Sequence, residues 1–440
     1  MAPSTTNPDK DALRLKRVLG TGALVTFGLA YLVPLTVFTT VGSAMRTTQG
    51  HLPMAYLVTT LAMVFTSVSY AQLSRAYPTA GSAYTYARGN FGERLGFLVG
   101  WALLLDYLLL PAINYLIVGL YLNAQFPSIP VLAPAFVAIA LVTWLNIVGI
   151  EVVRRANLAM VLLQVGFAFV FVALAARFAH GHFPLGSFYS PSMSWTAVFA
   201  GSAILCLSFL GFDAVSTLAE EARDPKRMVP KAILLTTLSG GLMFTVIAYA
   251  AALALPDWRA VKVADAAGLE VVQPLGGQWL IAFFLCAYIG GCVASAIASQ
   301  ASVARILYAM GRDQILPKPL FGILNARFQT PARATLIVAL ISCAMACITL
   351  DTLVSVVNFG ALSAFSVVNL CVVKHFLIDG RRRSPKDLLI FGLVPLLGFA
   401  ATAWLWTSLS RDALIVGALW LAVGILYMVL RRPALSIEGA

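Results

Sequence analysis

The sequence predicts an all-α integral membrane protein with twelve transmembrane helices, and its composition and hydropathy carry that prediction. Of the 440 residues, 60% are hydrophobic and only 11% are charged, whereas soluble domains are about 45–50% apolar and about 25% charged. A soluble fold of this size has too little interior to bury so many apolar side chains. The mean hydropathy of +0.88 agrees. These values exclude a soluble enzyme, a secreted disulfide-rich domain and a soluble DNA-binding domain.

Twelve segments are apolar over roughly 20 residues, which is the length that spans a bilayer as a helix. The first is too long for the core of a signal peptide and leads directly into further apolar segments, so we expect it to be a membrane helix of the mature protein. The predicted spans are residues 20–44, 53–75, 94–123, 131–149, 156–177, 196–221, 231–255, 277–307, 333–350, 352–377, 388–409 and 412–430.

The basic residues predict the orientation of these spans. Of the 30 lysines and arginines, 25 fall in the tails and loops on the side that both termini share. Cytoplasmic loops carry such an excess, so we expect both termini in the cytoplasm of a multi-pass protein of the bacterial cytoplasmic (inner) membrane. The same distribution explains the net charge of +12 without nucleic acid as a partner. Histidines and cysteines form no ligand set, and we expect neither a metal nor a cofactor.

Two acidic residues lie in the middle of predicted spans. Asp106 is near the centre of span 94–123, and Asp213 is near the centre of span 196–221, with no lysine or arginine at matching depth. A charged side chain at mid-bilayer is costly, so such residues usually face a cavity, a partner or a translocation path. A structural acid that neighbouring hydroxyl and amide groups satisfy is the alternative.

The same two regions contain helix breakers. Pro34 follows Gly28 in the first span, and Gly211 lies beside Asp213 in the sixth. Proline removes a backbone hydrogen bond, glycine loosens a helix, and unwound backbone at membrane depth requires surrounding protein or a water-filled cavity. Each alone could be a simple kink.

Interrupted helices at corresponding places in two halves of a chain mark the midplane site of inverted-repeat transporters. We therefore expect two repeats of five helices, inserted in opposite senses, and two extra helices. The predicted parts are a cytoplasmic tail (1–17), the first repeat (18–185), the second repeat (186–380), the extra helices (381–432) and a second cytoplasmic tail (433–440).

Three motifs resemble those of amino acid–polyamine–organocation permeases, in the same order and with the same spacing over the whole chain. The first is Tyr77-Pro-Thr-Ala-Gly81-Ser-Ala-Tyr84-Thr-Tyr86, the second runs from Glu220 to Ala232, and the third runs from Arg305 to Pro317, with Thr330-Pro331 following. Within this family the stretches 28–38, 105–111 and 209–215 are most similar to bacterial putrescine importers.

The resemblance implies a LeuT-like fold whose substrate site lies between the breaks in helices one and six, with helices three, eight and ten closing it. Carried over by position, the expected substrate-binding residues are Tyr31, Pro34 and Thr36; Asp106, Tyr107 and Asn114; Ser208, Phe209, Gly211, Phe212 and Asp213; and Tyr288 and Ser295. On helix eight, Cys292, Ser299 and Ser302 extend the face that Tyr288 and Ser295 begin. Packing of small residues between helices is the other interpretation of that face.

This sequence departs from the family pattern at two places. Amino acid permeases usually have a Gly-Ser-Gly stretch in helix one whose N–H groups bind the substrate carboxylate, and the matching residues here are Pro34-Leu35-Thr36. We expect weaker carboxylate binding because proline has no N–H group. In some relatives a helix-five lysine stands in for sodium, and Gln164 occupies that position.

Two buried carboxyl groups and a weakened carboxylate site favour an organic dication. Each ammonium group of putrescine, or of a related polyamine, could bond to a carboxylate, with Tyr31, Tyr107, Phe209 and Phe212 offering cation–π faces. We therefore predict a secondary transporter that imports putrescine by alternating access, with a proton as the coupling ion. The candidates for the proton carrier are Asp106, Asp213 and Glu220.

Three other functions were weighed against this one. An amino acid permease or exchanger of the same fold is the alternative. A membrane enzyme lacks a nucleophile with a base at motif spacing and lacks a cofactor fingerprint. A channel fits broken helices paired across a repeat less well than alternating access does.

Overall fold

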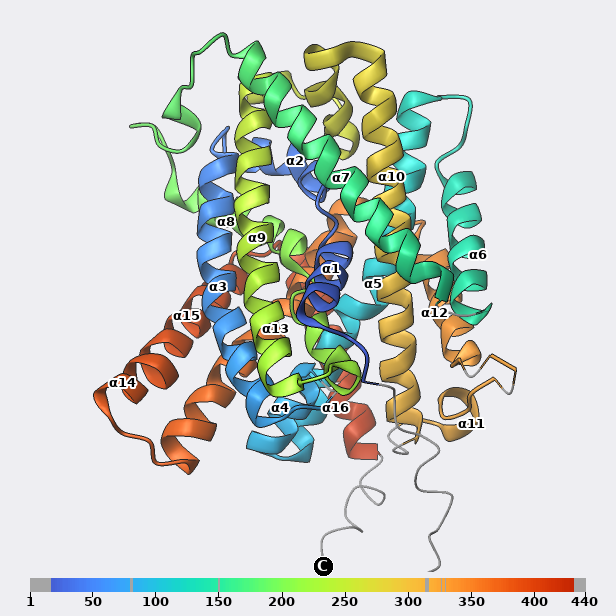
Figure 1. Cartoon of the computed structure of the whole chain (residues 1–440), viewed down its shortest axis with the longest axis vertical. Helices are drawn as coiled ribbons and strands as arrows, with labels where there is room; N and C mark the ends of the chain where they lie inside the picture. The colour runs from blue at the N-terminus through green and yellow to red at the C-terminus, as the bar shows by residue number, and fades with distance from the viewer. Residues whose placement is uncertain are drawn as a thin grey trace, which may run out of the picture.

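Helices packed along the long axis of the molecule make up the architecture of the computed structural model (Figure 1). It describes residues 17–79, 82–148, 151–312, 316–325, 327–328 and 330–430. The terminal segments 1–16 and 431–440, which contain most of the two predicted tails, lie outside the described residues. Within the described part there is no strand, and a single bridge pairs Leu19 with Ala222.

The long helices follow the apolar segments of the sequence in order, and short helices lie between them. They are α1 (Thr21–Leu32), α2 (Val37–Thr47), α3 (Leu52–Ala76), α4 (Ser82–Phe91), α5 (Glu93–Gln125), α6 (Leu132–Val148), α7 (Glu151–Phe178), α8 (Trp195–Leu205), α9 (Pro225–Ala254), α10 (Ala267–Arg312), α11 (Lys318–Phe321), α12 (Ala332–Met345), α13 (Leu350–Val372), α14 (Pro385–Asp387), α15 (Val394–Thr407) and α16 (Arg411–Leu430). Short 3₁₀-helices η3 (Cys206–Phe209) and η4 (Ala214–Glu221) continue α8, and π-helices η7 (Val373–Asp379) and η8 (Leu388–Leu393) flank the loop before α15.

Nine helical segments of the described chain are long and apolar enough to cross a membrane, or ten if α1 and α2 count as one span bent by 52°. The shorter apolar helices α6 and α12 lie where the fourth and ninth spans are predicted. The prediction of an all-helical, multi-pass membrane protein is therefore confirmed. The count of twelve spans and the inverted repeat stay predictions.

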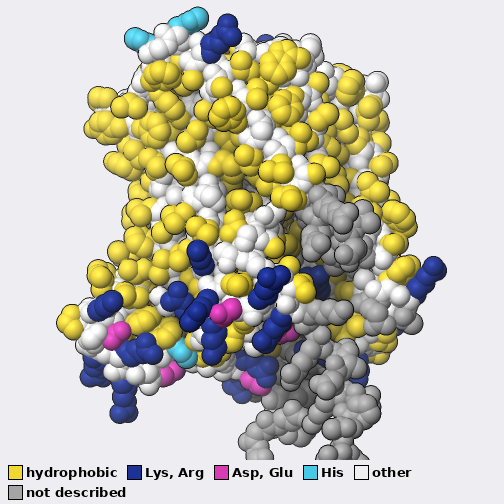
Figure 2. Space-filling model, in the orientation of Figure 1, with side chains coloured by type: hydrophobic (Ala, Val, Ile, Leu, Met, Phe, Trp, Pro, Cys, Tyr) yellow, Lys and Arg dark blue, Asp and Glu magenta, His cyan; other side chains and the backbone are white. Residues whose placement is uncertain are grey.

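The surface has the two-zone pattern of a membrane protein. Apolar side chains cover most of the face in Figure 2, and lysine and arginine gather at its lower end. Phe169, Leu242 and Leu340 are each about 70% exposed or more, as lipid-facing side chains are. The end of the bundle that is rich in lysine and arginine holds α11 and α14 (Figures 1 and 2), and we call it the basic end.

Helix α4 was not predicted, although it lies in the first motif. It is too short and too polar to span a bilayer, and Gly92, with φ of 88°, separates it from α5. It packs against α5 and α13 at the basic end. Hydropathy finds spans, so a short helix at the membrane surface leaves no signal of that kind.

Helix α5 forms the centre of the bundle and carries Asp106. In its most apolar stretch 94% of the residues are buried, compared with 17% for the peripheral α16. It packs mainly against α10, α13 and α4. A side chain on its inner faces therefore meets protein on all sides.

Candidate functional site

The first helix is interrupted between α1 and α2. Val33 has φ of 54° and ψ of 101°, and the two helices meet at 52°. The interruption frees carbonyl groups, and side chains satisfy them. Thr36 Oγ1 donates to the carbonyl oxygens of Leu32 and, at 2.7 Å, Val33, while Ser295 Oγ of α10 donates to that of Tyr31 at 3.0 Å. Side-chain hydrogen bonds therefore stabilise the unwound turn, as buried backbone groups require.

The N–H groups of this turn are also engaged. The Leu35 N–H donates to Gln164 Oε1 of α7 at 3.4 Å, and the Thr36 N–H donates to the Val33 carbonyl at 2.8 Å. Pro34 has no N–H group. These three residues thus hold no backbone donor in reserve for a substrate carboxylate, which agrees with the reasoning from the sequence.

The second interruption follows α8. The chain leaves α8 at Leu205, passes through η3 and turns at Gly211, where φ is 127°. A Cβ atom on Gly211 would lie 2.5 Å from Cδ1 of Tyr31. Glycine is required here for its backbone conformation and because it lets the second break touch the first.

Asp213 lies directly after this turn, with its side chain 1% exposed. The Gly211 N–H donates to its Oδ1 at 3.2 Å. The Tyr107 hydroxyl of α5 donates to its Oδ2 at 2.9 Å. These bonds orient the carboxyl group toward the central helix.

Asp106, one residue before Tyr107, is 1% exposed. Its Oδ1 atom and the Tyr31 hydroxyl have no hydrogen-bond partner among the described residues. The ring of Tyr31 lies 6.4 Å from that of Tyr107, which follows Asp106 in α5 and donates to Asp213. The two carboxyl groups and two tyrosines therefore form one polar cluster.

In the described part of the chain, no buried basic side chain accompanies this cluster. Among the described side chains, Asp106 and Asp213 are the only buried aspartates or glutamates, and no lysine or arginine is buried. Buried charges are normally paired. The cluster thus has the charge to receive a cation or a proton.

A small cavity adjoins the two breaks. Its space open to the centre of a water molecule is about 10 Å³, which is roughly the room for one water. A diamine would therefore enter only when the surrounding helices separate. The lining residues are Tyr31, Leu32, Val33, Thr36, Thr39, Leu110, Ile113, Asn114, Ile117, Leu207, Leu210, Cys292 and Ser295.

The structure brings part of the predicted site to this cavity. Tyr31, Thr36, Asn114 and Ser295 line it, and Asn114 Nδ2 donates to Ser295 Oγ at 3.1 Å. Cys292 lines it as well, so the predicted face of helix eight does point toward the breaks.

The other predicted residues, Asp106 and Asp213 among them, are not part of the cavity lining. The ring of Phe209 packs edge-on against Phe244, and that of Phe212 lies 5.5 Å from the ring of Tyr70. These two rings contact other aromatic rings, and Leu207 and Leu210 of the same segment reach the cavity instead.

Ser208 and Tyr288 form hydrogen bonds that brace the breaks. The hydroxyl groups of Ser208 and Tyr56 are 3.0 Å apart, and those of Tyr288 and Thr39 are 2.5 Å apart. Glu220 is exposed at the end of η4, outside the buried cluster that Asp106 and Asp213 form.

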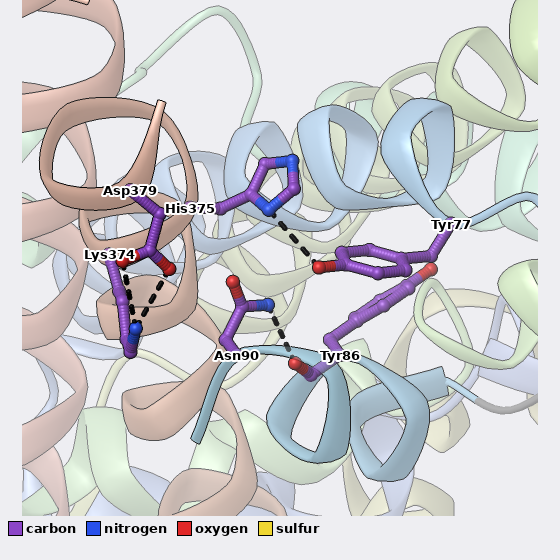
Figure 3. A network of polar contacts seen from close by, with 6 residues as sticks. All are labelled: Tyr77, Tyr86, Asn90, Lys374, His375 and Asp379. Atoms are coloured by element: carbon purple, nitrogen blue, oxygen red, sulfur yellow. Dashed lines mark hydrogen bonds and ion pairs between the residues drawn. The ribbon is translucent and has the colours of Figure 1, made fainter. Parts of the chain in front are cut away.

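The family motifs fasten the basic end. Arg305 of the third motif pairs with Glu221 of the second at 3.7 Å. Figure 3 shows the first motif against η7, where the Tyr77 hydroxyl and His375 Nδ1 share a hydrogen bond of 3.1 Å. In the same view Lys374 pairs with Asp379 at 2.8 Å. The contacts of Arg305 with Glu221 and of Tyr77 with His375 join separate segments of the chain, whereas the pair Lys374–Asp379 lies within η7.

Reasoning from the sequence missed several residues. Leu207, Leu210, Ile113 and Ile117 line the cavity, but an apolar residue in an apolar span carries no distinguishing signal. Asn358 of α13 is also buried and donates to the end of α8. An asparagine inside an apolar span is itself a signal in the sequence, because a polar side chain at that depth needs a partner.

Known proteins resemble this chain over nearly its whole length. The family described as "Amino acid permease" matches residues 19–430. The low-affinity putrescine importer PlaP of Escherichia coli (strain K12) is 36% identical over 431 residues, or 96% of this chain and 95% of the relative. The branched-chain amino acid permease BcaP of Bacillus subtilis (strain 168) is 28% identical, over 82% of this chain and 81% of the relative. A methylthioribose transporter of the same organism is 27% identical, over 94% and 92%.

A bundle of apolar helices around a closed polar site, together with these relatives, defines a multi-pass membrane transporter and not an enzyme. The chain belongs to the amino acid permease family, within the amino acid–polyamine–organocation superfamily. The resemblance read from the three motifs is thereby confirmed.

Proposed function

We propose that this protein imports putrescine, or a related polyamine, by proton-coupled alternating access. The observation that carries the proposal is the pair Asp106 and Asp213, which is buried without a basic partner in the described part of the chain. Ammonium groups form charge-assisted hydrogen bonds with carboxylates. The 36% identity to a putrescine importer supports the same substrate class.

The unpartnered atoms suggest how the substrate binds. Asp106 Oδ1 and the Tyr31 hydroxyl are buried polar atoms whose hydrogen bonds remain unmade, and an unmade buried bond costs about 1–3 kcal/mol. An ammonium donor beside Asp106 relieves that cost. Asp213 is already oriented by Tyr107 and Gly211 and presents the second carboxylate.

Transport requires the closed site to open to each side in turn. The breaks at Val33–Thr36 and at Gly211 meet at the Tyr31 ring, so they are the places where the helices on either side can change angle. Under this proposal the chain is a five-plus-five inverted repeat (18–185 and 186–380), and its first helices carry these breaks. A proton carried on Asp106 or Asp213, with Glu220 as the exposed candidate, links proton movement to substrate movement.

The orientation follows from charge. The basic end (Figure 2) is assigned to the cytoplasm of a bacterial inner membrane, because cytoplasmic loops carry the excess of lysine and arginine. Both termini then lie in the cytoplasm, and the bilayer surrounds the apolar zone.

Uptake of radiolabelled putrescine into proteoliposomes tests the proposal, with and without an inward proton gradient. Wild-type protein should show saturable uptake that the gradient stimulates. Asp213→Asn should lose about 2–5 kcal/mol of substrate binding, or roughly 30-fold or more in affinity, because an amide keeps the shape and removes the charge. Asp412→Asn is the matched control, since Asp412 lies in the exposed first turn of α16. Wild-type uptake by Asp213→Asn would refute the assignment.

An amino acid permease or exchanger is the second candidate, and the observation that favours it is the likeness to a branched-chain amino acid permease. In that case leucine or ornithine should compete with labelled putrescine at least as well as unlabelled putrescine does. The engaged N–H groups of Leu35 and Thr36 argue against it.

A further inference from the structure

Helix α13 touches both chain segments that carry the buried carboxyl groups. Gly360 lies against α5, where a Cβ atom would be 2.5 Å from the Ala102 carbonyl oxygen, 2.9 Å from Leu105 Cβ and 3.3 Å from the Asp106 nitrogen. Real Cβ atoms do not approach backbone oxygen so closely. The absence of a side chain at Gly360 therefore fixes how near α13 lies to the backbone of Asp106.

Two residues earlier, Asn358 holds the other segment. Its Nδ2 donates to the carbonyl oxygens of Ala203 and Ile204, at 3.0 and 3.2 Å, and its side chain is fully buried. These carbonyl groups lie at the end of α8, where the chain departs from the α-helix. Asn358 thus anchors the start of the break that leads to Asp213.

Phe365 holds the far end of the same break. It lies seven residues after Asn358, about two helical turns along α13, and its ring centroid is 5.2 Å from that of Phe212. Phe212 directly precedes Asp213. Helix α13 therefore contacts the chain on both sides of the turn at Gly211.

We propose that Asn358 and Gly360 are positioning residues that set the separation of Asp213 and Asp106, and thereby the length of diamine that the site accepts. The proposal rests on the proposed function. Each methylene group moves the second ammonium of a diamine further from the first. An ammonium–carboxylate hydrogen bond holds over only about 2.7–2.9 Å, so a shift of α13 by a few tenths of an ångström changes which chain length fits.

The test compares three diamines in proteoliposomes: 1,3-diaminopropane, putrescine and cadaverine, each competing with labelled putrescine. Gly360→Ala should push α13 away from α5 and widen the separation. The cadaverine-to-putrescine ratio of inhibition should then rise at least threefold. Asn358→Ala removes the two hydrogen bonds from α13 to the end of α8 and loosens the break, so the differences among the three diamines should shrink at least threefold.

Two control variants perturb α13 without touching either carboxylate segment. Asn369→Ala removes a buried amide of the same helix that donates to Thr66 Oγ1 at 3.2 Å. Gly398→Ala, in α15, places a methyl group against the Asn369 side chain, with contacts down to 2.7 Å, away from Asn358 and Gly360. Both should lower the amount of folded protein and leave the inhibition ratios at the wild-type values.

The outcomes separate this inference from the proposed function. Equal losses for all three diamines in Gly360→Ala and Asn358→Ala, or ratio changes as large in the controls, would overturn the inference while putrescine import stands. Wild-type protein that takes up no diamine would overturn both. If Gly360→Ala does not fold, Asn358→Ala decides alone, because it removes atoms and creates no clash.

Discussion

The Tyr107 hydroxyl reaches Asp213 from a neighbouring helix, while the next residue back, Asp106, has an oxygen atom with no partner in the described part of the chain. The two carboxyl groups thus have different surroundings. Asp213 is held in place, and Asp106 keeps bonding capacity for a ligand. The site thus has one carboxyl group oriented by hydrogen bonds and one with an oxygen atom that can still accept a hydrogen bond.

The difference predicts a dependence on the number of charges in the substrate. Asp106→Asn should weaken competition by putrescine more than competition by butylamine, because only a diamine has a second ammonium for the second carboxylate. The measurement is inhibition of labelled putrescine uptake by each amine. Equal losses for both amines would indicate that Asp106 is a proton site or a structural acid.

A second residue-scale prediction concerns Gly211. Alanine there would adopt a φ of 127°, which costs an L-residue about 1–3 kcal/mol, and its Cβ would press on the Tyr31 ring. Gly211→Ala should therefore lower the melting temperature of the purified protein and abolish putrescine uptake. Gly186→Ala, at a position open to space, should leave both unchanged, and equal behaviour of the two variants would contradict this account.

Side-chain hydrogen bonds hold both helix breaks in place. Thr36 and Ser295 satisfy the carbonyl groups of the first break, and Gln164 accepts from its Leu35 N–H. Asn358 donates to two carbonyl groups at the start of the second break, those of Ala203 and Ile204. The breaks therefore hold their shape through partners elsewhere in the chain, and helix propensity alone does not determine them.

The first break should discriminate between amines with and without a carboxylate group. Putrescine and ornithine differ by one carboxylate, and the break has no spare N–H group at residues 34–36 to bind it. Ornithine should compete at least tenfold less well than putrescine, or about 1.4 kcal/mol. Replacing Pro34-Leu35-Thr36 by Gly-Ser-Gly should narrow the gap in a folded variant. Ornithine competing as well as putrescine with the unmodified protein would favour the amino acid permease.

Across the whole molecule, charge and apolar surface are separated along the long axis. Apolar side chains cover most of the face in Figure 2, and lysine and arginine gather at its lower end. The ion pair between Arg305 and Glu221 and the contact of Tyr77 with His375 tie segments distant in sequence together. The basic end therefore carries the charge from which we infer the orientation, and its contacts hold distant segments of the chain together.

The orientation can be tested with single cysteines in a background without the native ones. Arg383→Cys places a thiol in the exposed loop between η7 and α14 at the basic end, and Ser192→Cys places one at an exposed position in the loop before α8. A membrane-impermeant thiol reagent added to intact cells should label the cysteine at 192 and not the one at 383. Inverted vesicles should give the opposite result, and the reverse assignment would place the termini outside.

Apolar length alone located the membrane helices, because a helix in a bilayer must satisfy its own backbone and present about 20 apolar residues. The same local reasoning singled out Pro34, Gly211, Asp106 and Asp213, since breakers and acids are conspicuous in such a background. Only the tertiary structure decided that Leu207 and Leu210 line the cavity in place of Phe209 and Phe212, because the direction of a side chain depends on the local turn. It also decided that Gln164 and Asn358 hold the breaks. Those bonds join residues 129 and 155 positions apart, and no local pattern encodes a contact that packing alone creates.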